Sequence, residues 1–259
     1  MNYSLTHDIV RGLPRVVASW NSLGDYLEDV QAIYPSVTKY GHSAPQIQKL
    51  LLPDPKITEK LERFRATLDR TELVKSTKLE LSVSDGTLDV GLYLSGEPEC
   101  FVKITKVHGN DVRIVFSPEV HLSSNADALY LRGAAILSLM DSLESSGNRV
   151  ELYMGWDNTV GSKVYESRIL VKRTCDYATA AQLAGIACDR SFLLSCEYNM
   201  IAHFLKTGGV GGNHGLSIPG DIVISGEYSE MAHFDSTEST LAWIETMKAK
   251  LASRDGKIQ

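Results

Sequence analysis

A chain of 259 residues in which 43% are hydrophobic and 22% are charged has enough apolar side chains for a sizeable core, which excludes intrinsic disorder. Its 32 acidic and 26 basic side chains leave a formal net charge of -6, which disfavours binding to the nucleic-acid backbone. Apolar runs fall short of the about 18 residues that span a bilayer, and the first residues lack the pattern of a secretory signal. We therefore expect a cytoplasmic protein without a membrane partner.

The first part of the chain, residues 1–75, is expected to form a helical N-terminal segment. Ser22 can cap a helix that begins at Leu23 and ends before Pro35. A second helix is predicted over 57–73, because its apolar residues recur at three- and four-residue spacing as one stripe with charges elsewhere. The residues of this stripe are Ile57, Leu61, Phe64 and Leu68.

From residue 76 to residue 259 the pattern is that of an α/β domain. Residues 79–83 alternate apolar and polar side chains, as a half-buried strand does. The runs 100–107 and 112–117 are predicted to pair as a β-hairpin, because the glycine and asparagine between them tolerate the φ angles of a tight turn.

A strand–helix–strand unit follows. A long helix with a broad apolar face is predicted over 125–146 and ends at Gly147, and the apolar run 149–156 is predicted to be a strand. Downstream we expect a strand over 166–173, helices over 177–189 and 192–206, a strand over 221–225 and a helix over 239–253. Asp176 is the expected cap of the first of these helices, and Asp235 with Glu238 the capping box of the last. This order predicts a Rossmann-like, mostly parallel sheet with helices on both faces.

Candidate functional side chains lie in the loops that follow predicted strands, since open α/β sheets bind ligands at the carboxyl ends of their strands. Three loops qualify, at 117–125, 155–159 and 226–230. Their hydroxyls and carboxylates are hard oxygen ligands of the kind that Mg²⁺ prefers. The predicted metal set is Ser117, Glu119, Ser123, Asp157 and Glu227. The alternative is that Ser123 or Ser124 caps the long helix and that the acidic side chains are solvated.

Other familiar chemistry finds little support in the sequence. The glycine-rich stretch 208–215 is preceded by a predicted helix and followed by a predicted strand, whereas a phosphate-binding P-loop needs the reverse order. The cysteines form no CxxC pair, and no GxSxG nucleophile elbow is present. We therefore expect no catalytic residue among these motifs.

Two passages carry a resemblance to a known fold family. Residues 113–156 (RIVFSPEVHLSSNADALYLRGAAILSLMDSLESSGNRVELYMGW) resemble the first strand, long helix and second strand of von Willebrand factor A-like (VWA-like) domains, particularly those of a poorly characterised family carried by phages and plasmids. Residues 89–102, with the sequence Gly96-Glu97-Pro98-Glu99 at their centre, resemble a signature that lies just upstream in that family. The resemblance extends over residues 88–250.

This resemblance implies a Rossmann-like sheet and, in many members, a metal-dependent adhesion site built on a DxSxS motif. At the corresponding place this chain has Ser117, Pro118, Glu119, Val120 and His121, so the leading aspartate is missing. No cofactor is therefore expected apart from Mg²⁺ at the predicted set.

The expected function is that of a non-catalytic binding or assembly module of a phage or plasmid, which acts in the host cytoplasm on protein partners through its strand-end surface. One alternative is a metal-dependent nucleic-acid-processing enzyme that uses Glu119, Asp157 and Glu227. Another is a nucleic-acid-binding factor, for which two basic clusters are available despite the unfavourable net charge. These clusters are Lys60, Arg63 and Arg65, and Lys163, Arg168, Lys172 and Arg173.

Overall fold

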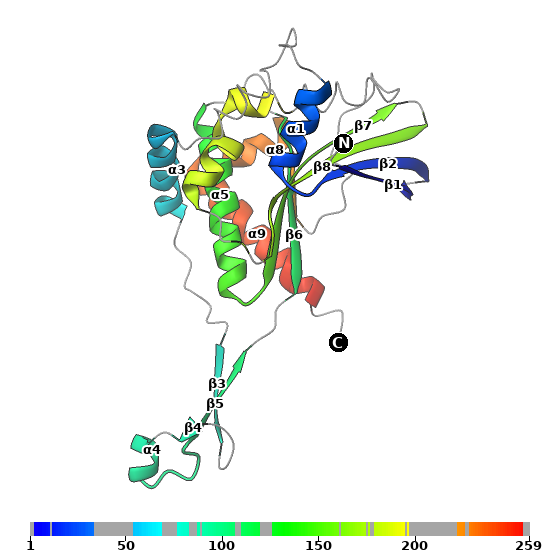
Figure 1. Cartoon of the computed structure of the whole chain (residues 1–259). Coiled ribbons are helices and arrows are strands. Elements are labelled where there is room, and N and C mark those ends of the chain that lie inside the picture. The colour runs from blue at the N-terminus through cyan, green and yellow to red at the C-terminus, as the bar shows by residue number, and fades with distance from the viewer. Residues whose placement is uncertain are drawn as a thin grey trace.

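The computed structural model describes residues 3–10, 12–33, 54–68, 77–82, 87–88, 90–106, 110–119, 126–160, 162–174, 176, 179–194, 196, 222–225 and 228–255 (Figure 1). The strands in these ranges are β1 (Tyr3–Val10), β2 (Leu13–Trp20), β3 (Thr77–Ser82), β4 (Thr87–Leu88), β5 (Phe101–Lys106), β6 (Asp111–Phe116), β7 (Arg149–Val160), β8 (Lys163–Lys172) and β9 (Ile222–Ile224). The helices are α1 (Leu23–Ile33), α3 (Pro55–Leu68), α4 (Val90–Leu94), α5 (Ala126–Ser145), α6 (Ala180–Leu183), the π-helix η1 (Ala184–Cys188), α8 (Tyr228–Met231), the 3-10 helix η2 (Ala232–Phe234) and α9 (Thr237–Asp255).

The main sheet is six-stranded, with the order β1-β2-β8-β7-β6-β9. Strand β6 is parallel to both of its neighbours, β7 and β9, and β2 is parallel to β8. The pairs β1·β2 and β7·β8 are antiparallel. The prediction of an α/β fold around a mostly parallel sheet is therefore confirmed.

The start of the chain is not helical as predicted, because residues 3–10 and 13–20 form the paired strands β1 and β2, of which β1 is the edge of the main sheet. Strand β2 has buried side chains at alternate positions on the core side, as Ala18 and Trp20 show, whereas the described side chains of β1 are mostly exposed. Gly12, with a φ of 78°, supplies the turn between them. The helices predicted after Ser22 and over 57–73 are confirmed as α1 and α3.

The predicted hairpin between runs 100–107 and 112–117 is wrong. Strand β5 pairs with β3 and β4 in a separate three-stranded sheet, whereas β6 lies inside the main sheet. In Figure 1 the small sheet and α4 form an arm that extends away from the main body. The physical reason is burial, since Ile114, Val115 and Phe116 of β6 are buried on both faces, as only a central strand can be.

The loop predicted at 155–159 is also wrong, because these residues belong to the long strand β7. Strands β7 and β8 form an antiparallel hairpin in which Asp157 lies opposite Glu166. The chain reverses only after Val160, so Asp157 lies within a continuous strand, on the face opposite to Trp156.

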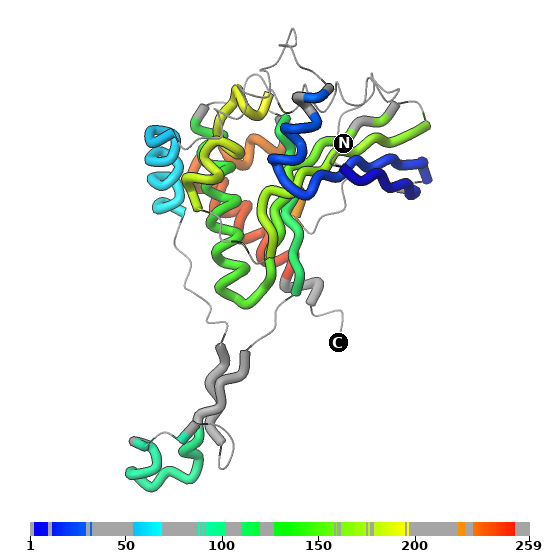
Figure 2. The backbone as a smooth tube through the Cα atoms, viewed as in Figure 1, coloured from blue at the N-terminus to red at the C-terminus, as the bar shows by residue number. Residues whose placement is uncertain are grey.

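One apolar core lies between the main sheet and the helices. Its sheet residues alternate along each strand, as in Leu152, Met154 and Trp156 of β7, and therefore come from a single face. Helix α5 is buried around much of its circumference, because the sheet, α3, η1 and α9 all pack against it (Figure 2). Apart from α4 in the arm, the helices in the described ranges thus share one core on one face, whereas helices on both faces were expected.

The helix ends agree with the sequence in part. The backbone N–H of Asp25 donates to Ser22 Oγ over 3.0 Å, which confirms the predicted cap of α1, and Gly147, with a φ of 89°, ends α5 as predicted. Thr179 rather than Asp176 caps α6. Helix α9 has its reciprocal cap one residue later than predicted, between Ser236 and Ser239.

Gly133 of α5 lies where η1 approaches most closely. A Cβ at this position would overlap the Cys188 sulfur and come within 3.3 Å of Leu61 Cδ1. We therefore expect Gly133→Ala to lower the free energy of unfolding by about 1–3 kcal/mol in urea denaturation. Gly24→Ala in α1 is the matched control, because its Cβ would meet only Ser22 Oγ at 3.5 Å. Equal urea midpoints for the two variants would contradict this close contact.

Candidate functional site

The carboxyl end of β6 is the topological switch point of the sheet. The chain passes from β6 through α5 to β7 on one side, whereas β9 lies on the other side, parallel to β6 (Figure 1). Open α/β sheets bind ligands in the crevice outside such a point. Ser117 and Glu119 follow β6 directly, and Ser117 N–H donates to the Ile224 carbonyl of β9 over 2.8 Å. We name this place the strand-end crevice after its position in the fold; Ser117 is buried there, with 1% of its surface accessible.

The side chain of Arg132, in α5, extends to the strand-end crevice. Long side chains of a helix point back toward its N-terminus, which here lies at the carboxyl end of β6. The Arg132 Nη1 donates to the backbone carbonyls of Ser117 and Glu119, over 3.3 and 3.4 Å, and lies 4.0 Å from Met231 Sδ. The side chain is fully buried. The guanidinium therefore lies between the end of β6 and α8.

The charge of Arg132 is not balanced by an acid in the described part of the chain. Its Nε and Nη2 have no hydrogen-bond acceptor there, and no carboxylate in these ranges forms an ion pair with it. Burial lowers the pKa of Arg132 to about 10, so the group stays charged at neutral pH. The nearby Cys188 is a neutral thiol, because burial raises its pKa to about 12.

A buried cation at this place has a clear chemical consequence. The partial positive charge at the N-terminus of α5 adds to that of Arg132, so the crevice attracts an anion and repels a metal ion. Among the described residues, moreover, no group of three or more His, Cys, Asp and Glu side chains could hold a metal ion. The planar guanidinium matches the geometry of carboxylate and phosphate groups, and among protein side chains the carboxylate is the anion that it can bind with two parallel hydrogen bonds.

The structure brings together only part of the predicted metal set. Ser117 and Glu119 are adjacent, and the Glu119 N–H donates to Ser117 Oγ over 3.0 Å. Asp157 lies within β7, where its charge acts on Glu166 rather than on the crevice. Ser123, Glu227 and the glycine-rich stretch 208–215 lie outside the described residues.

Sequence reasoning missed Arg132, although the sequence holds a signal for it. Arg132 occupies a position of the apolar stripe that runs through Leu129, Ile136 and Leu139, at the three- and four-residue spacing of one helix face. A single arginine in an otherwise apolar stripe indicates a buried charge, and buried charges are rare enough to suggest a specific role.

A second charged cluster lies on the sheet face opposite the core. Glu166 is fully buried and accepts hydrogen bonds from Arg15, over 3.0 Å, and from Arg168. Arg15 also donates to Asp8 of β1 over 2.6 Å. This hydrogen bond lowers the pKa of Asp8, whereas burial raises that of Glu166. The cluster ties together β1, β2 and β8, although the buried Nη2 of Arg168 has no hydrogen-bond partner among the described residues.

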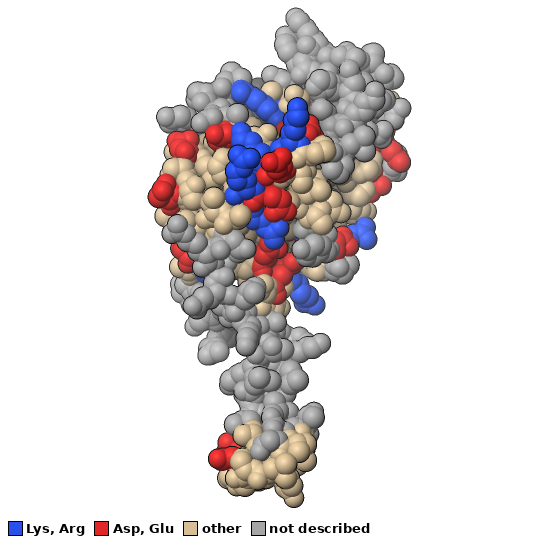
Figure 3. Space-filling view, turned by 90° about the vertical axis from the view of Figure 1, so that its left-hand side faces the viewer, with Lys and Arg blue, Asp and Glu red and all other residues tan. Residues whose placement is uncertain are grey.

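The two basic clusters considered for nucleic acid are paired with acids. Lys60 contacts Asp127 over 2.5 Å, and basic and acidic side chains alternate on this face of the molecule (Figure 3). In the second cluster Lys172 is buried and contacts Glu144 over 2.6 Å. Neither cluster therefore presents a continuous basic surface.

These features define an α/β domain with an open mixed sheet and an arginine at its switch point. The chain belongs to the family described as Domain of unknown function (DUF7192), whose model matches residues 8–252. The match runs from β1 into α9 and so includes the arm. No curated protein and no solved structure matches the chain. Within the described ranges, every helix is too short or too polar to cross a membrane.

Proposed function

We propose that this chain is a non-catalytic protein-binding module with a VWA-like kernel, and that its strand-end crevice receives an acidic side chain of a partner protein. The observation that carries the proposal is the buried, unbalanced guanidinium of Arg132 at the switch point. In this proposal the arginine takes the role that a metal ion has in the adhesion site of the wider superfamily.

The order of elements supports the VWA-like kernel. Strand β6, the long helix α5 and the parallel strand β7 follow one another, as in the resemblance noted for residues 113–156. Ser117 takes the place of the aspartate that would begin the metal motif. A site that has lost its leading carboxylate and gained a buried cation has the charge of an anion site.

The physical cost of Arg132 supports a functional role. A charge taken out of water without a partner costs several kcal/mol. Two long hydrogen bonds to carbonyls do not satisfy the five donors of a guanidinium. A carboxylate from a partner would complete this set, so that part of the cost is recovered when the complex forms.

The resemblance to a family carried by phages and plasmids supplies the proposed setting, which is an assembly in the host cytoplasm. Binding rather than catalysis is favoured because the feature that carries the proposal, the buried guanidinium of Arg132, can hold an anion but cannot act as a base or a nucleophile.

A carboxylate probe tests this function without knowledge of the partner. We expect N-acetyl-aspartyl-amide to raise the melting temperature of the full chain in EDTA, because a ligand that binds only the folded state stabilises it. The neutral isostere N-acetyl-asparaginyl-amide is expected to have no effect. The Arg132→Met variant is expected to show no rise with either compound, relative to its own melting temperature.

Three outcomes would count against the proposal. An equal rise with the two compounds would exclude recognition of charge, and no rise with either would exclude an open carboxylate site. A rise that requires Mg²⁺ in place of EDTA would favour the metal site predicted at Ser117 and Glu119.

A further inference from the structure

The end of the arm exposes an unusual amount of apolar surface. Six large hydrophobic side chains are exposed in the described ranges, and four of them lie between residues 88 and 94. These four, which we name the tip patch, are Leu88, Val90, Tyr93 and Leu94, with 40%, 60%, 60% and 78% of their surface accessible. Apolar side chains gathered in this way mark interaction sites on protein surfaces.

Two backbone hydrogen bonds close the turn that follows α4, beneath the tip patch. The Gly96 N–H donates to the Tyr93 carbonyl and the Glu97 N–H to the Leu92 carbonyl, each over 3.1 Å. Gly96 has a φ of 80°, which closes this turn after α4. A fixed backbone means that little conformational entropy is lost when a partner binds the patch.

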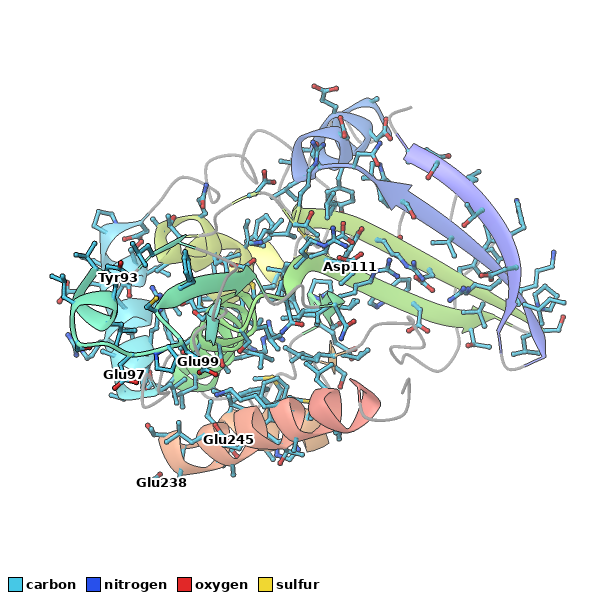
Figure 4. All side chains as sticks on the ribbon, turned by 90° about the horizontal axis from the view of Figure 1, so that it is seen from below. Tyr93, Glu97, Glu99, Asp111, Glu238 and Glu245 are labelled. Atoms are coloured by element: carbon cyan, nitrogen blue, oxygen red, sulfur yellow. The ribbon has the colours of Figure 1, made fainter. Side chains whose placement is uncertain are left out.

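The charged residues in the sequence around the tip patch have one sign. Residues 85–100 contain four acidic residues and neither lysine nor arginine. Glu97 and Glu99 belong to the same small unit as Tyr93 (Figure 4), and acidic side chains lie beside the apolar surface at the end of the arm (Figure 3). A surface that complements the tip is therefore apolar with a basic rim.

We propose that the tip patch docks into an apolar groove of another protein, and that lysine and arginine side chains rim this groove. Tyr93 and Leu94 are the anchors, because these consecutive residues are a tyrosine and a large aliphatic side chain and both are highly exposed. An anionic membrane is disfavoured because it repels the four acids. The same patch of a second copy is disfavoured because it would place acid against acid.

The tip patch is independent of the strand-end crevice. The arm belongs to a separate sheet, and Figure 1 shows its end far from the carboxyl end of β6. Two partners, or two parts of one partner, can therefore be bound at once. The docking inference stands or fails separately from the role of Arg132.

Site-specific photocrosslinking tests this inference in cells that express the full chain. We place p-benzoylphenylalanine at position 93, where it resembles the native tyrosine, and at position 245 of α9, where the exposed Glu245 provides the control. A protein adduct is expected at position 93 and not at 245. Mass spectrometry is expected to locate the adduct in an apolar segment flanked by lysine or arginine.

Two variants make the test specific. Leu94→Asp is expected to lower the adduct yield about tenfold by removing an anchor. The double reversal Glu97→Lys with Glu99→Lys is expected to lower it as well, and both variants are expected to keep the melting temperature of the parent. Adducts only with a second copy of the chain or with lipid, yields that neither variant changes, or no adduct at position 93 would each overturn the inference.

Discussion

Replacing Arg132 with methionine is expected to stabilise the chain by about 1–4 kcal/mol while it abolishes the response to a carboxylate. Methionine has a similar length, carries no charge to desolvate, and would lie beside Met231 in an apolar environment. For a chain of this size the gain corresponds to a melting temperature higher by roughly 2–4 °C per kcal/mol. Differential scanning calorimetry provides the measurement.

This prediction distinguishes a buried arginine that binds a ligand from one that holds the fold together. If the bonds from Arg132 to the carbonyls of Ser117 and Glu119 were a necessary structural tie, Arg132→Met would lower the melting temperature instead. Arg63→Met is the matched control for the loss of one positive charge, because the Arg63 side chain is 73% exposed. Its effect is expected to stay within about 0.5 kcal/mol.

The helices of this fold could be predicted from the sequence because their signals are local. The stripe through Leu61 and Leu68 and the cap at Ser22 each lie within a few residues, and both are confirmed. In contrast, the partner of a strand is chosen by burial across the whole chain. Strand β5 ends a few residues before β6 begins, but β6 pairs with β7 and β9 because its two apolar faces need a central position.

The candidate site could be predicted only in its position. The rule that ligands bind at the carboxyl ends of strands led to Ser117 and Glu119, which do lie at the switch point. The same rule led to Asp157 by way of a turn that does not exist, since β7 continues to Val160. Arg132 was missed because it comes from the helix behind the crevice and not from a loop in front of it.

Removing the carboxylate of Glu166 is expected to have the largest effect on stability. Glu166→Leu is expected to lower the free energy of unfolding by about 3–5 kcal/mol in urea at pH 7, because Arg15 and Arg168 would lose the acid that they share. The double variant Arg15→Met with Glu166→Leu is expected to recover part of this loss, since one buried cation is removed with its partner.

An exposed ion pair provides the control for Glu166. Arg149 and Asp111 are 65% and 67% exposed, and Asp111→Asn is expected to cost less than about 1 kcal/mol. Equal costs for Glu166→Leu and Asp111→Asn would show that the contribution of the cluster of Arg15, Glu166 and Arg168 to stability does not depend on its burial.

The pH dependence gives a second test of the same group. Burial raises the pKa of Glu166 above 4.5, although Arg168 and Arg15 act against this shift. Between pH 4.5 and the folded pKa, Glu166 is therefore protonated in the folded chain and ionised in the unfolded chain. The contribution of protonated Glu166 to the free energy of unfolding is complete below pH 4.5 and is lost as the pH rises through the folded pKa. The unfolding free energy of the parent, relative to Glu166→Gln, should thus fall as the pH rises. The lowered pKa of Asp8 makes the unfolding free energy rise with pH, but it does so in both proteins and cancels in the difference between them. A difference that grows with pH would mean that the two arginines outweigh burial.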